Sequence, residues 1–498
     1  MLKRAALLLS ALLCSSLAQA PTPAPAPAAP APQLRGLWVD AFSSGIKTPA
    51  EIDRLVAHAS RLGINVLFAQ VGRRMDCYCN RASVPRTEDP AVPAGFDPLE
   101  DLIRKAHAQG IQVHAWMITT AAHNFQLPAP KNPRHVLNEH GLDQYGSDNW
   151  LTAHYDGTFR AGNDYVLDPG HPDAARYIAE MYASVVRNYD VDGIMLDRVR
   201  YPDDGGSGAS SWGYNERALQ RYRQETGTRG TPTPDDPAWL QWRREQVTAL
   251  VRRIYLEVKS ARPDVWVSAS TITYGAGPAN EAAFRNTRTY REVLQDWPTW
   301  NRRGYLDLNV MMNYKRQSVT LQARWFDQWN SFAAQNRGRA KMASGSALYL
   351  NTLEGSAAQL RAVAASKLDG WAGYAYRSLI PGSGTELLSV DALRTALRVL
   401  PPRSAWGKPE PVRALRGELR WNNQQAAPGI QVELWRGSHL LERSQTDGLG
   451  SYGFVLPASS QGGPLELRAG GTRVTLAEPP RGVTRIPTVQ LGTPTGQR

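Results

Sequence analysis

Cysteine is scarce in this chain. Its 498 residues include 3 cysteines, and one of these, Cys14, lies in an apolar stretch near the start. Cys77 and Cys79 are separated by a single residue, and no second pair of thiols is available to complete a zinc site with them. A disulfide between residues this close closes a strained ring, so the sequence leaves open whether Cys77 and Cys79 are bridged. A scaffold stapled by several disulfides is excluded.

Signatures of several other function classes are also missing. No glycine-rich phosphate loop follows the first predicted strand, and the metalloprotease motif HEXXH is absent. The 9 histidines lack the spacing of metal ligands, so we expect neither a metal nor another cofactor. A metal site built from His114, His123 and Asp40 stays open as an alternative. After residue 20, no apolar run is long enough to cross a membrane.

Acidic residues are outnumbered by basic ones. The net charge of +12 favours anionic partners, such as acidic sugars or an anionic polymer of the cell envelope. The basic residues are scattered and no nucleic-acid-binding motif is present, so nucleic acid is not an expected partner. The aromatic residues are mainly the 15 Trp and 19 Tyr, against 9 Phe. Amphipathic rings of this kind suit surfaces that stack on flat polar ligands.

The first 33 residues predict export. Lys3 and Arg4 precede a short apolar run that ends in Ala18-Gln19-Ala20, which is typical of a secretory signal peptide over residues 1–20. Residues 21–33 are a linker rich in proline and alanine, which cannot build a core. We therefore expect a secreted protein, periplasmic or extracellular and associated with the cell envelope.

The next 370 residues or so alternate apolar runs with amphipathic helical stretches. The runs that predict strands are 34–40, 65–71, 111–118, 191–197, 264–271, 305–313, 341–349 and 370–376. Helices are predicted over 49–62, 97–109, 172–188, 237–260, 353–367 and 386–399. Eight strands that alternate with helices indicate an α/β protein with a (β/α)₈ TIM barrel and long loops, over residues 34–402. A doubly wound open sheet is the alternative, and the missing phosphate loop weakens it.

The pattern changes in the last hundred residues. Residues 403–498 alternate polar and apolar side chains with period two and carry turn signals at Pro428-Gly429 and Asp447-Gly448. This predicts a small all-β sandwich as an accessory module. Through "GIQVELW" and "TDGLGSYGF" it resembles the transthyretin-like and Cna-B-like modules of secreted proteins. A role as a spacer is favoured over a role in sugar binding.

The strand at 191–197 delivers a carboxylate to its own carboxyl end. In a TIM barrel, the carboxyl ends of the strands form the active site and the amino ends stabilise the fold. Asp197 shares a face with Met195 and Gly193, so it should point into the barrel mouth. An unpaired carboxylate there is costly unless it has a function. Asp192 precedes the strand, and we expect it to be structural.

Other strand ends add polar and aromatic groups. Asp40, Asp76 and Asp168 compete for the role of a second catalytic carboxyl beside Asp197. The predicted substrate-binding residues at or beyond strand ends are Arg73, His114, Trp116, Arg200, Tyr201, Asn313, Tyr314, Tyr376 and Arg377. Together they describe a polar cleft lined by aromatic rings, which is how carbohydrates are bound.

A family resemblance supports this interpretation. "RGLWVDAF", "AHAQGIQVHAWM", "LDPGHPDAARYI" and "YDVDGIMLDRVRYP" occur in the order seen in the glycosyl-hydrolase-like family ten, and so does "WRREQVTALVRRIYLEVKSARPDV" after them. The resemblance covers about residues 34–400 and implies a secreted or envelope-attached TIM-barrel glycosidase that acts on bacterial cell-wall glycan. The family motif often has Asp-Asp where this chain has Asp197-Arg198. That difference removes a second acid from the most obvious place.

We therefore expect a glycoside hydrolase of a bacterial envelope polysaccharide, with the glycan strands of peptidoglycan as substrate. Hydrolysis would use two carboxyl groups, and the sequence leaves open whether Asp197 is the acid/base or the nucleophile. The alternatives are a non-catalytic glycan-binding protein, a hydrolase of a poly-N-acetylglucosamine polymer and a metal-dependent deacetylase. The oligomeric state is not predicted.

Overall fold

The structure is a computed structural model that describes residues 33–385, 387–457 and 462–492. The predicted signal peptide, residues 1–20, lies outside the described residues. So does the predicted linker, residues 21–33, except for its last residue. Among the described residues, no helix combines the length and the apolar character needed to span a membrane.

Eight parallel strands close into a barrel in the order β1-β10-β9-β8-β7-β6-β3-β2. Their bounds are β1 Leu34–Val39, β2 Val66–Gly72, β3 Gln112–Ile118, β6 Gly193–Asp197, β7 Trp266–Ile272, β8 Leu308–Met312, β9 Lys341–Ala347 and β10 Gly370–Tyr374. Each strand was expected from the sequence, and no end moves by more than three residues. The predicted TIM barrel is confirmed, because buried parallel strands read as apolar runs that are easy to recognise.

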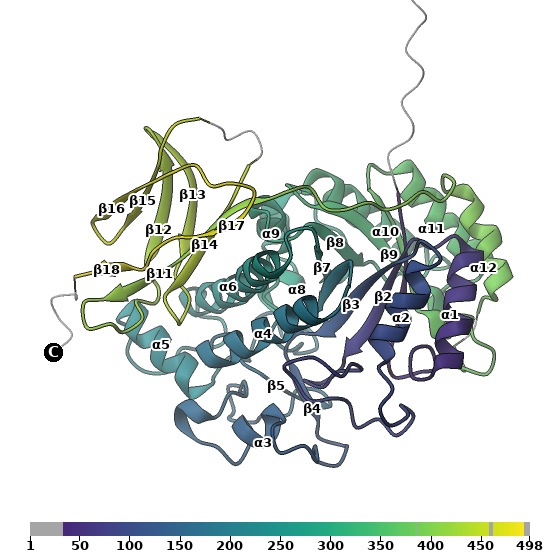
Figure 1. Ribbon diagram of the computed structural model, residues 1–498, viewed down its shortest axis with the longest axis horizontal. Coiled ribbons are helices and arrows are strands. Elements are labelled where there is room, and N and C mark those ends of the chain that lie inside the picture. Colours follow the sequence, from purple (N-terminus) through teal and green to yellow (C-terminus); the bar gives the residue numbers. More distant parts are fainter. Residues whose placement is uncertain (1–32, 386, 458–461, 493–498) are drawn as a thin grey trace, which may run out of the picture. The chain divides into compact units, whose positions relative to one another are not determined.

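Helices follow the strands and lie outside the ring that the strands form (Figure 1). Their bounds are α1 Pro49–Leu62, α2 Pro98–His107, α3 Val136–His140, α4 Pro172–Asn188, α5 Glu216–Thr226, α6 Pro237–Ala261, α7 Glu281–Phe284, α8 Arg288–Arg291, α9 Trp297–Arg303, α10 Thr320–Gln335, α11 Leu353–Ala365 and α12 Val390–Ala396. Short 3₁₀ turns are η1 Gly146–Asp148, η2 Leu348–Leu350, η3 Tyr376–Leu379 and η4 Leu397–Val399.

The sequence marks some of these helices better than others. α1, α2, α4 and α6 each begin with proline after a side chain that accepts a backbone N–H, a strong start signal. The sequence did not predict α10, which follows β8. It begins after Val319, which supplies no capping hydrogen bond, so its start carries no such signal.

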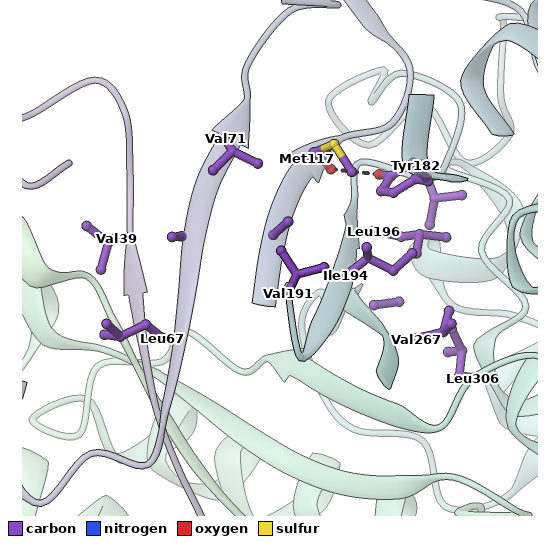
Figure 2. Packing of buried hydrophobic residues seen from close by; sticks show 14 of the residues in the cluster. Val39, Leu67, Val71, Met117, Tyr182, Val191, Ile194, Leu196, Val267 and Leu306 are labelled. Atoms are coloured by element: carbon purple, nitrogen blue, oxygen red, sulfur yellow. Dashed lines mark hydrogen bonds between the residues drawn. The ribbon is translucent and has the colours of Figure 1, made fainter. Parts of the chain in front are cut away.

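The main core lies between the barrel and its helices. Outward-facing strand residues such as Val39, Leu67 and Ile194 are fully or almost fully buried there (Figure 2). Tyr182 of α4 donates its hydroxyl hydrogen to the carbonyl oxygen of Met117 at 2.8 Å, which ties this helix to β3 (Figure 2). This contact holds α4 against the outer side of β3, the strand that pairs with β6.

A second hydrophobic cluster fills the barrel interior. At the amino ends of the strands it is closed by Trp406, which lies beyond the barrel's predicted last residue, 402. Trp406 stacks on Trp266, the first residue of β7, with ring centroids 5.3 Å apart. The indole N–H of Trp266 donates to the carbonyl oxygen of Gly407 at 3.2 Å. The boundary between residues 402 and 403 stays a prediction, and residues 406 and 407 contact the barrel nonetheless.

The longest loop, between β3 and α4, holds an antiparallel ribbon that the sequence did not predict. β4 Ala121–Asn124 pairs with β5 Asp164–Val166. The loop after β2 contains a disulfide between Cys77 and Cys79, which answers the question that the sequence left open.

The C-terminal residues form two four-stranded sheets within residues 413–491, which we call the β-module. All pairings in one sheet are antiparallel, whereas the other has one antiparallel and two parallel pairings. The strands of the β-module are β11 Arg413–Trp421, β12 Gln431–Arg436, β13 His439–Gln445, β14 Ser451–Leu456, β15 Leu465–Ala469, β16 Thr472–Leu476, β17 Gly482–Arg485 and β18 Val489–Leu491. Leu415, Val432 and Phe454 belong to its own hydrophobic core. The expected small all-β unit after the barrel is therefore present.

Two arginines of α6 bond to the β-module. Arg252 donates to the Ser444 hydroxyl and to the Gln445 carbonyl oxygen, both at 2.8 Å. Arg253 pairs with Asp447 at 2.7 Å, and both side chains are about nine-tenths buried. These buried, charged contacts hold the β-module in one orientation on α6. A spacer that moves freely relative to the barrel would not need them.

Candidate active site

Asp197 lies at the carboxyl end of β6, and two N–H donors hold its carboxylate. The indole N–H of Trp116 on β3 donates to Oδ2 at 3.0 Å, and the backbone N–H of Arg198 donates to Oδ1 at 2.8 Å. Thr120 donates its hydroxyl hydrogen to the Arg198 carbonyl oxygen at 2.9 Å. The carboxylate therefore has a fixed orientation, as a catalytic group requires.

Arg198 adopts an unusual backbone conformation directly after Asp197. Its φ of 49° lies in the left-handed region, which residues other than glycine rarely adopt. Its guanidinium points to Asp164 of β5, with Nη1 2.8 Å from Oδ2. The left-handed turn thus directs the Arg198 side chain to the ribbon while the chain leaves the strand. Such backbone strain clusters at functional sites.

An aromatic wall lines the mouth around Tyr374, the last residue of β10. The Tyr374 ring stacks on Tyr314 with centroids 5.1 Å apart. It also contacts Trp38, Trp116 and Tyr349 at centroid distances of 6.0, 6.3 and 6.2 Å. Burial, reinforced by the charge of Asp40, raises the pKa of Tyr374 to about 12. Its phenol is therefore a hydrogen-bond donor at neutral pH.

Asp40 and Asp197 both lie at the mouth, where the charge of each acts on the Tyr374 phenol. One layer deeper, the indole N–H of Trp38 on β1 reaches the Met195 sulfur on β6 at 3.1 Å, across the barrel interior. Two residues further along each strand, the next inward positions are Asp40 and Asp197. Backbone N–H groups of Phe42 and Ser43 donate to Asp40 Oδ1, both at 3.1 Å. The structure therefore brings two of the four predicted carboxyls to one opening.

Several buried polar atoms near the mouth have no hydrogen-bond partner among the described residues. They are Asp40 Oδ2, Gln70 Nε2, Ser270 Oγ and Arg377 Nε. Arg377 Nε is 3.6 Å from Asp40 Oδ2, which is an ion pair but longer than a hydrogen bond. Buried polar groups are normally paired, so this convergence indicates a site that binds a polar ligand.

The structure does not bring Asp168 to the mouth. Asp168 follows β5, which is part of the ribbon rather than the barrel, and its side chain is fully buried. It accepts hydrogen bonds from the Gly170 N–H at 2.7 Å and from the Tyr201 hydroxyl at 2.8 Å. Burial raises the pKa of Asp168. Tyr201 is fully buried as well, so both residues shape the loop.

His114 lies one layer below Trp116, inside the barrel. Its side chain is fully buried, and its imidazole fills the space that glycine leaves at position 193. Burial lowers the pKa of His114 to about 4. A neutral imidazole packed in the core does not line the cleft.

Asn313 and Tyr376 point outward to the helices. Asn313 donates to Asn330 Oδ1 of α10 at 3.2 Å, and the Tyr376 hydroxyl lies 3.0 Å from His58 Nδ1 of α1. The next residue after Asn313, Tyr314, is the one in the mouth. Similarly, β10 ends at Tyr374, and the chain then turns into η3. The predicted strand 370–376 ended two residues too late, so Tyr376 was assigned to the site in place of Tyr374.

Two cavities open in the loops beside the mouth. The first, about 260 Å³, is lined by Arg74, Arg198 and Arg200 around Asp164. Asp164 pairs with Arg74 and with Arg198, both at 2.8 Å, whereas Arg200 has a buried Nε without a partner among the described residues. The second cavity, about 440 Å³, is lined by Arg73, Arg74, Asp76 and their neighbours. Asp76 accepts the backbone N–H groups of Arg73 and Arg74, both at 3.1 Å, and so organises this loop.

No group of three or more His, Cys, Asp or Glu side chains in the described ranges is placed to bind a metal ion. The alternative site from His114, His123 and Asp40 is not assembled, since His114 is buried in the barrel interior and Asp40 lies at its mouth.

Two residues at the mouth, Tyr374 and Ser270, were not predicted from the sequence, although the period-two pattern of their strands marks them. On β10, Tyr374 shares the inward face with Ala372, and on β7, Ser270 shares it with Trp266. Ala372 and Trp266 both belong to the cluster in the barrel interior. Counting by two from those residues would have found them. Tyr349 lies in the turn η2 after β9, where no strand periodicity applies.

The protein is a closed parallel TIM barrel with carboxylates and aromatic rings at the carboxyl ends of its strands, which is where barrel active sites are built. The sequence matches the glycosyl hydrolase-like 10 family over residues 33–349, and the chain belongs to that family.

The chain is also similar to individual proteins. It is 26% identical to glycosyl hydrolase DigH of Escherichia coli K12 over 269 residues, 53% of this chain and 57% of that protein. It is 25% identical to glycosyl hydrolase YngK of Bacillus subtilis over 303 residues, 58% of this chain and 53% of that protein. The chain thus spans about half the length of these relatives. Its fold resembles the catalytic domain of β-amylase from Paenibacillus polymyxa, with a TM-score of 0.52, 13% identity, and 75% and 100% of the two chains covered.

Proposed function

We propose that this protein is a secreted enzyme that hydrolyses glycosidic bonds in a bacterial envelope polysaccharide, with the glycan strands of peptidoglycan as its substrate. The observation that carries the proposal is that Asp197 and Asp40 share one mouth, lined by aromatic rings, at the carboxyl ends of the strands. Glycoside hydrolysis uses one carboxyl group to protonate the leaving oxygen and a second as nucleophile or base. Asp197 and Asp40 form that pair.

The surrounding residues support a sugar substrate. Tyr374 and Tyr314 offer ring faces and phenol donors, and aromatic rings of this kind bind the apolar faces of sugars. Gln70 and Arg377 offer buried donors without partners among the described residues, which sugar hydroxyls would accept. The positive net charge supports an acidic polymer, and glycan strands stripped of peptide carry a lactyl carboxylate on every second sugar.

The proposal is tested by incubating the protein with purified sacculi that an amidase has stripped of peptides. We expect soluble oligosaccharides to appear, detected by chromatography and mass spectrometry. Poly-N-acetylglucosamine is run in parallel, because release from that polymer alone would overturn the choice of peptidoglycan. Binding to sacculi that pellets the protein without any release would indicate a non-catalytic glycan-binding protein.

Tyr374 provides a prediction about substrate binding. Replacing Tyr374 with phenylalanine removes one hydrogen-bond donor, worth ~0.5–1.5 kcal/mol, so KM should rise about two- to tenfold at ~1.4 kcal/mol per factor of ten. Replacing it with alanine removes the ring as well and should raise KM by more than about tenfold. Steady-state kinetics on stripped glycan measure both effects. Tyr376→Phe, which changes a buried tyrosine outside the mouth, is the control, and an alanine variant with unchanged KM would contradict the assignment.

A further inference from the structure

The second cavity, which we call the proline hollow, lies beside the barrel mouth. Cations from Arg73, Arg74, Arg86 and Lys131 line it, together with apolar side chains that include Pro85, Leu127 and Pro130. It shares Arg74 with the first cavity, which is lined by Arg198, the neighbour of Asp197. Arg73 and Arg74 also follow directly after β2 and lie over the ring of Phe42, two residues after Asp40, so the proline hollow adjoins the mouth.

The acidic residues of the proline hollow are already engaged by the protein. Glu88 accepts the backbone N–H groups of Lys131 and Asn132 at 3.1 and 2.8 Å. Asp89 pairs with Lys47 at 3.0 Å and accepts the Tyr78 hydroxyl at 2.7 Å. Asp76 accepts two backbone N–H groups, as described above. These carboxylates are held in place by bonds within their own loop and to the loops that carry Lys47 and Lys131.

Of the four cations that line the proline hollow, Arg74 pairs with Asp164 and Arg86 donates to Asn80 Oδ1 and to the Pro93 carbonyl oxygen, whereas the other two are less fully engaged. Arg73 is 3.8 Å from Asp89, its nearest ion-pair partner. Lys131 is exposed, and its ammonium takes part in none of the ion pairs of the described residues. Arg73 and Lys131 therefore offer charge-assisted donors to an anionic group that enters the proline hollow.

One buried side-chain nitrogen of the proline hollow has no hydrogen-bond partner within bonding distance among the described residues. His123, on β4, is 9% exposed, and its Nε2 has no hydrogen-bond partner among the described residues. Burial lowers the pKa of His123, so the imidazole is neutral at neutral pH and acts through a hydrogen bond rather than a charge. A buried polar atom in a cavity wall indicates a ligand that completes its bonding.

We propose that the proline hollow binds a carboxylate carried on a short aliphatic arm of the polymer whose backbone occupies the mouth. This inference rests on the proposed function, since the polymer is its substrate. Guanidinium and ammonium groups bind the carboxylate, and the proline and leucine side chains contact the aliphatic part. A neutral sugar ring fits less well, because the lining offers prolines and a leucine where a tryptophan or tyrosine face would stack on the sugar. Both the lactyl ether of a muramic sugar and a short acidic peptide have this chemistry.

Calorimetric titration of the full chain tests the proposal with three probes. They are N-acetylmuramic acid, the dipeptide alanyl-glutamate and the neutral sugar N-acetylglucosamine. At least one of the two carboxylates should bind, and Lys131→Ala and Arg73→Ala should each weaken that binding about tenfold, as expected for one charge-assisted bond of ~1.4 kcal/mol. Which carboxylate responds identifies the source of the arm. Arg134→Ala, which removes a neighbouring exposed cation outside the lining, is the matched control.

Three outcomes would overturn the proposal. They are no binding of either carboxylate, equal binding of the neutral sugar, and an equal loss in the Arg134 variant, which would indicate non-specific attraction. Lys131 is exposed, so its variant should fold normally, and the thermal unfolding curve checks this. The titration does not depend on hydrolysis. A chain that binds a carboxylate in this way but releases no oligosaccharide from glycan would refute the proposed function, and only the carboxylate site in the proline hollow would stand.

Discussion

Replacing Asp197 with asparagine is expected to lower the rate of glycan hydrolysis by ~10²–10⁴-fold, the usual loss when acid–base catalysis is removed. The substitution keeps the size of the side chain and removes only the ionisable group. The rate of oligosaccharide release from stripped sacculi measures the effect. Asp40→Asn should cause a loss of similar size if Asp40 is the second carboxyl of the pair.

The structure also predicts a cost in stability for this variant. Both carboxylate oxygens of Asp197 accept N–H donors, from Trp116 and from Arg198, whereas an asparagine side chain has one acceptor oxygen. One donor is left facing an NH₂ group, which costs ~1–3 kcal/mol. Asp192→Asn is the control, because Asp192 lies beside the opposite, amino end of β6, where it bonds to His107 and to the Val113 N–H, and its replacement should leave turnover nearly unchanged. Wild-type turnover in the Asp197 variant would show that Asp197 is structural.

Replacing Asp447 with alanine is expected to destabilise the protein by ~3 kcal/mol. Removing one partner of a buried ion pair typically costs ~3–5 kcal/mol, because the other charge stays buried. Here Glu257 remains 3.2 Å from Arg253, which places the loss at the lower end. Differential scanning calorimetry measures it as a lower unfolding temperature. Turnover at 25 °C should not change, since Asp447 contacts no residue of the mouth.

The same pair predicts how this stability depends on pH. Burial alone would raise the pKa of Asp447, but the charges of Arg253 and Arg252 outweigh it and hold the pKa below its usual value. Stability from a carboxyl with a depressed pKa is fully present above the unfolded-state pKa of ~3.9 and is lost as pH falls through the folded-state value. The difference between wild type and variant should therefore be constant at neutral pH and shrink below about pH 4.

An exposed ion pair provides the control for this prediction. Lys408 and Asp264 are 3.4 Å apart, and each side chain is about half exposed. Exposed pairs contribute ~0–1 kcal/mol, so Asp264→Ala should change the unfolding temperature little. An Asp447 variant no less stable than the Asp264 variant would mean that the contact between α6 and the β-module contributes nothing.

The sequence by itself determined the barrel and identified three residues of the candidate active site. Each strand is buried on both faces, so it reads as an apolar run, and the eight runs with their helices allow few folds. Asp197 was found because it ends such a run on the inward face, Trp116 because it lies near the end of its run, and Tyr314 because it directly follows the end of its run. These inferences need only local periodicity and the rule that barrel sites lie at strand carboxyl ends.

Only the tertiary structure decided which residues share the site. Closing the barrel brings Asp40, directly after β1, and Asp197, at the end of β6, to the same mouth, while Asp168 stays in a loop outside the ring of strands. The point where each strand ends determines whether Tyr374 or Tyr376 enters the mouth, and apolar runs do not mark that point. The contact of Arg253 with Asp447 joins residues 194 positions apart. Such pairings depend on the path of the whole chain, which local sequence patterns do not encode.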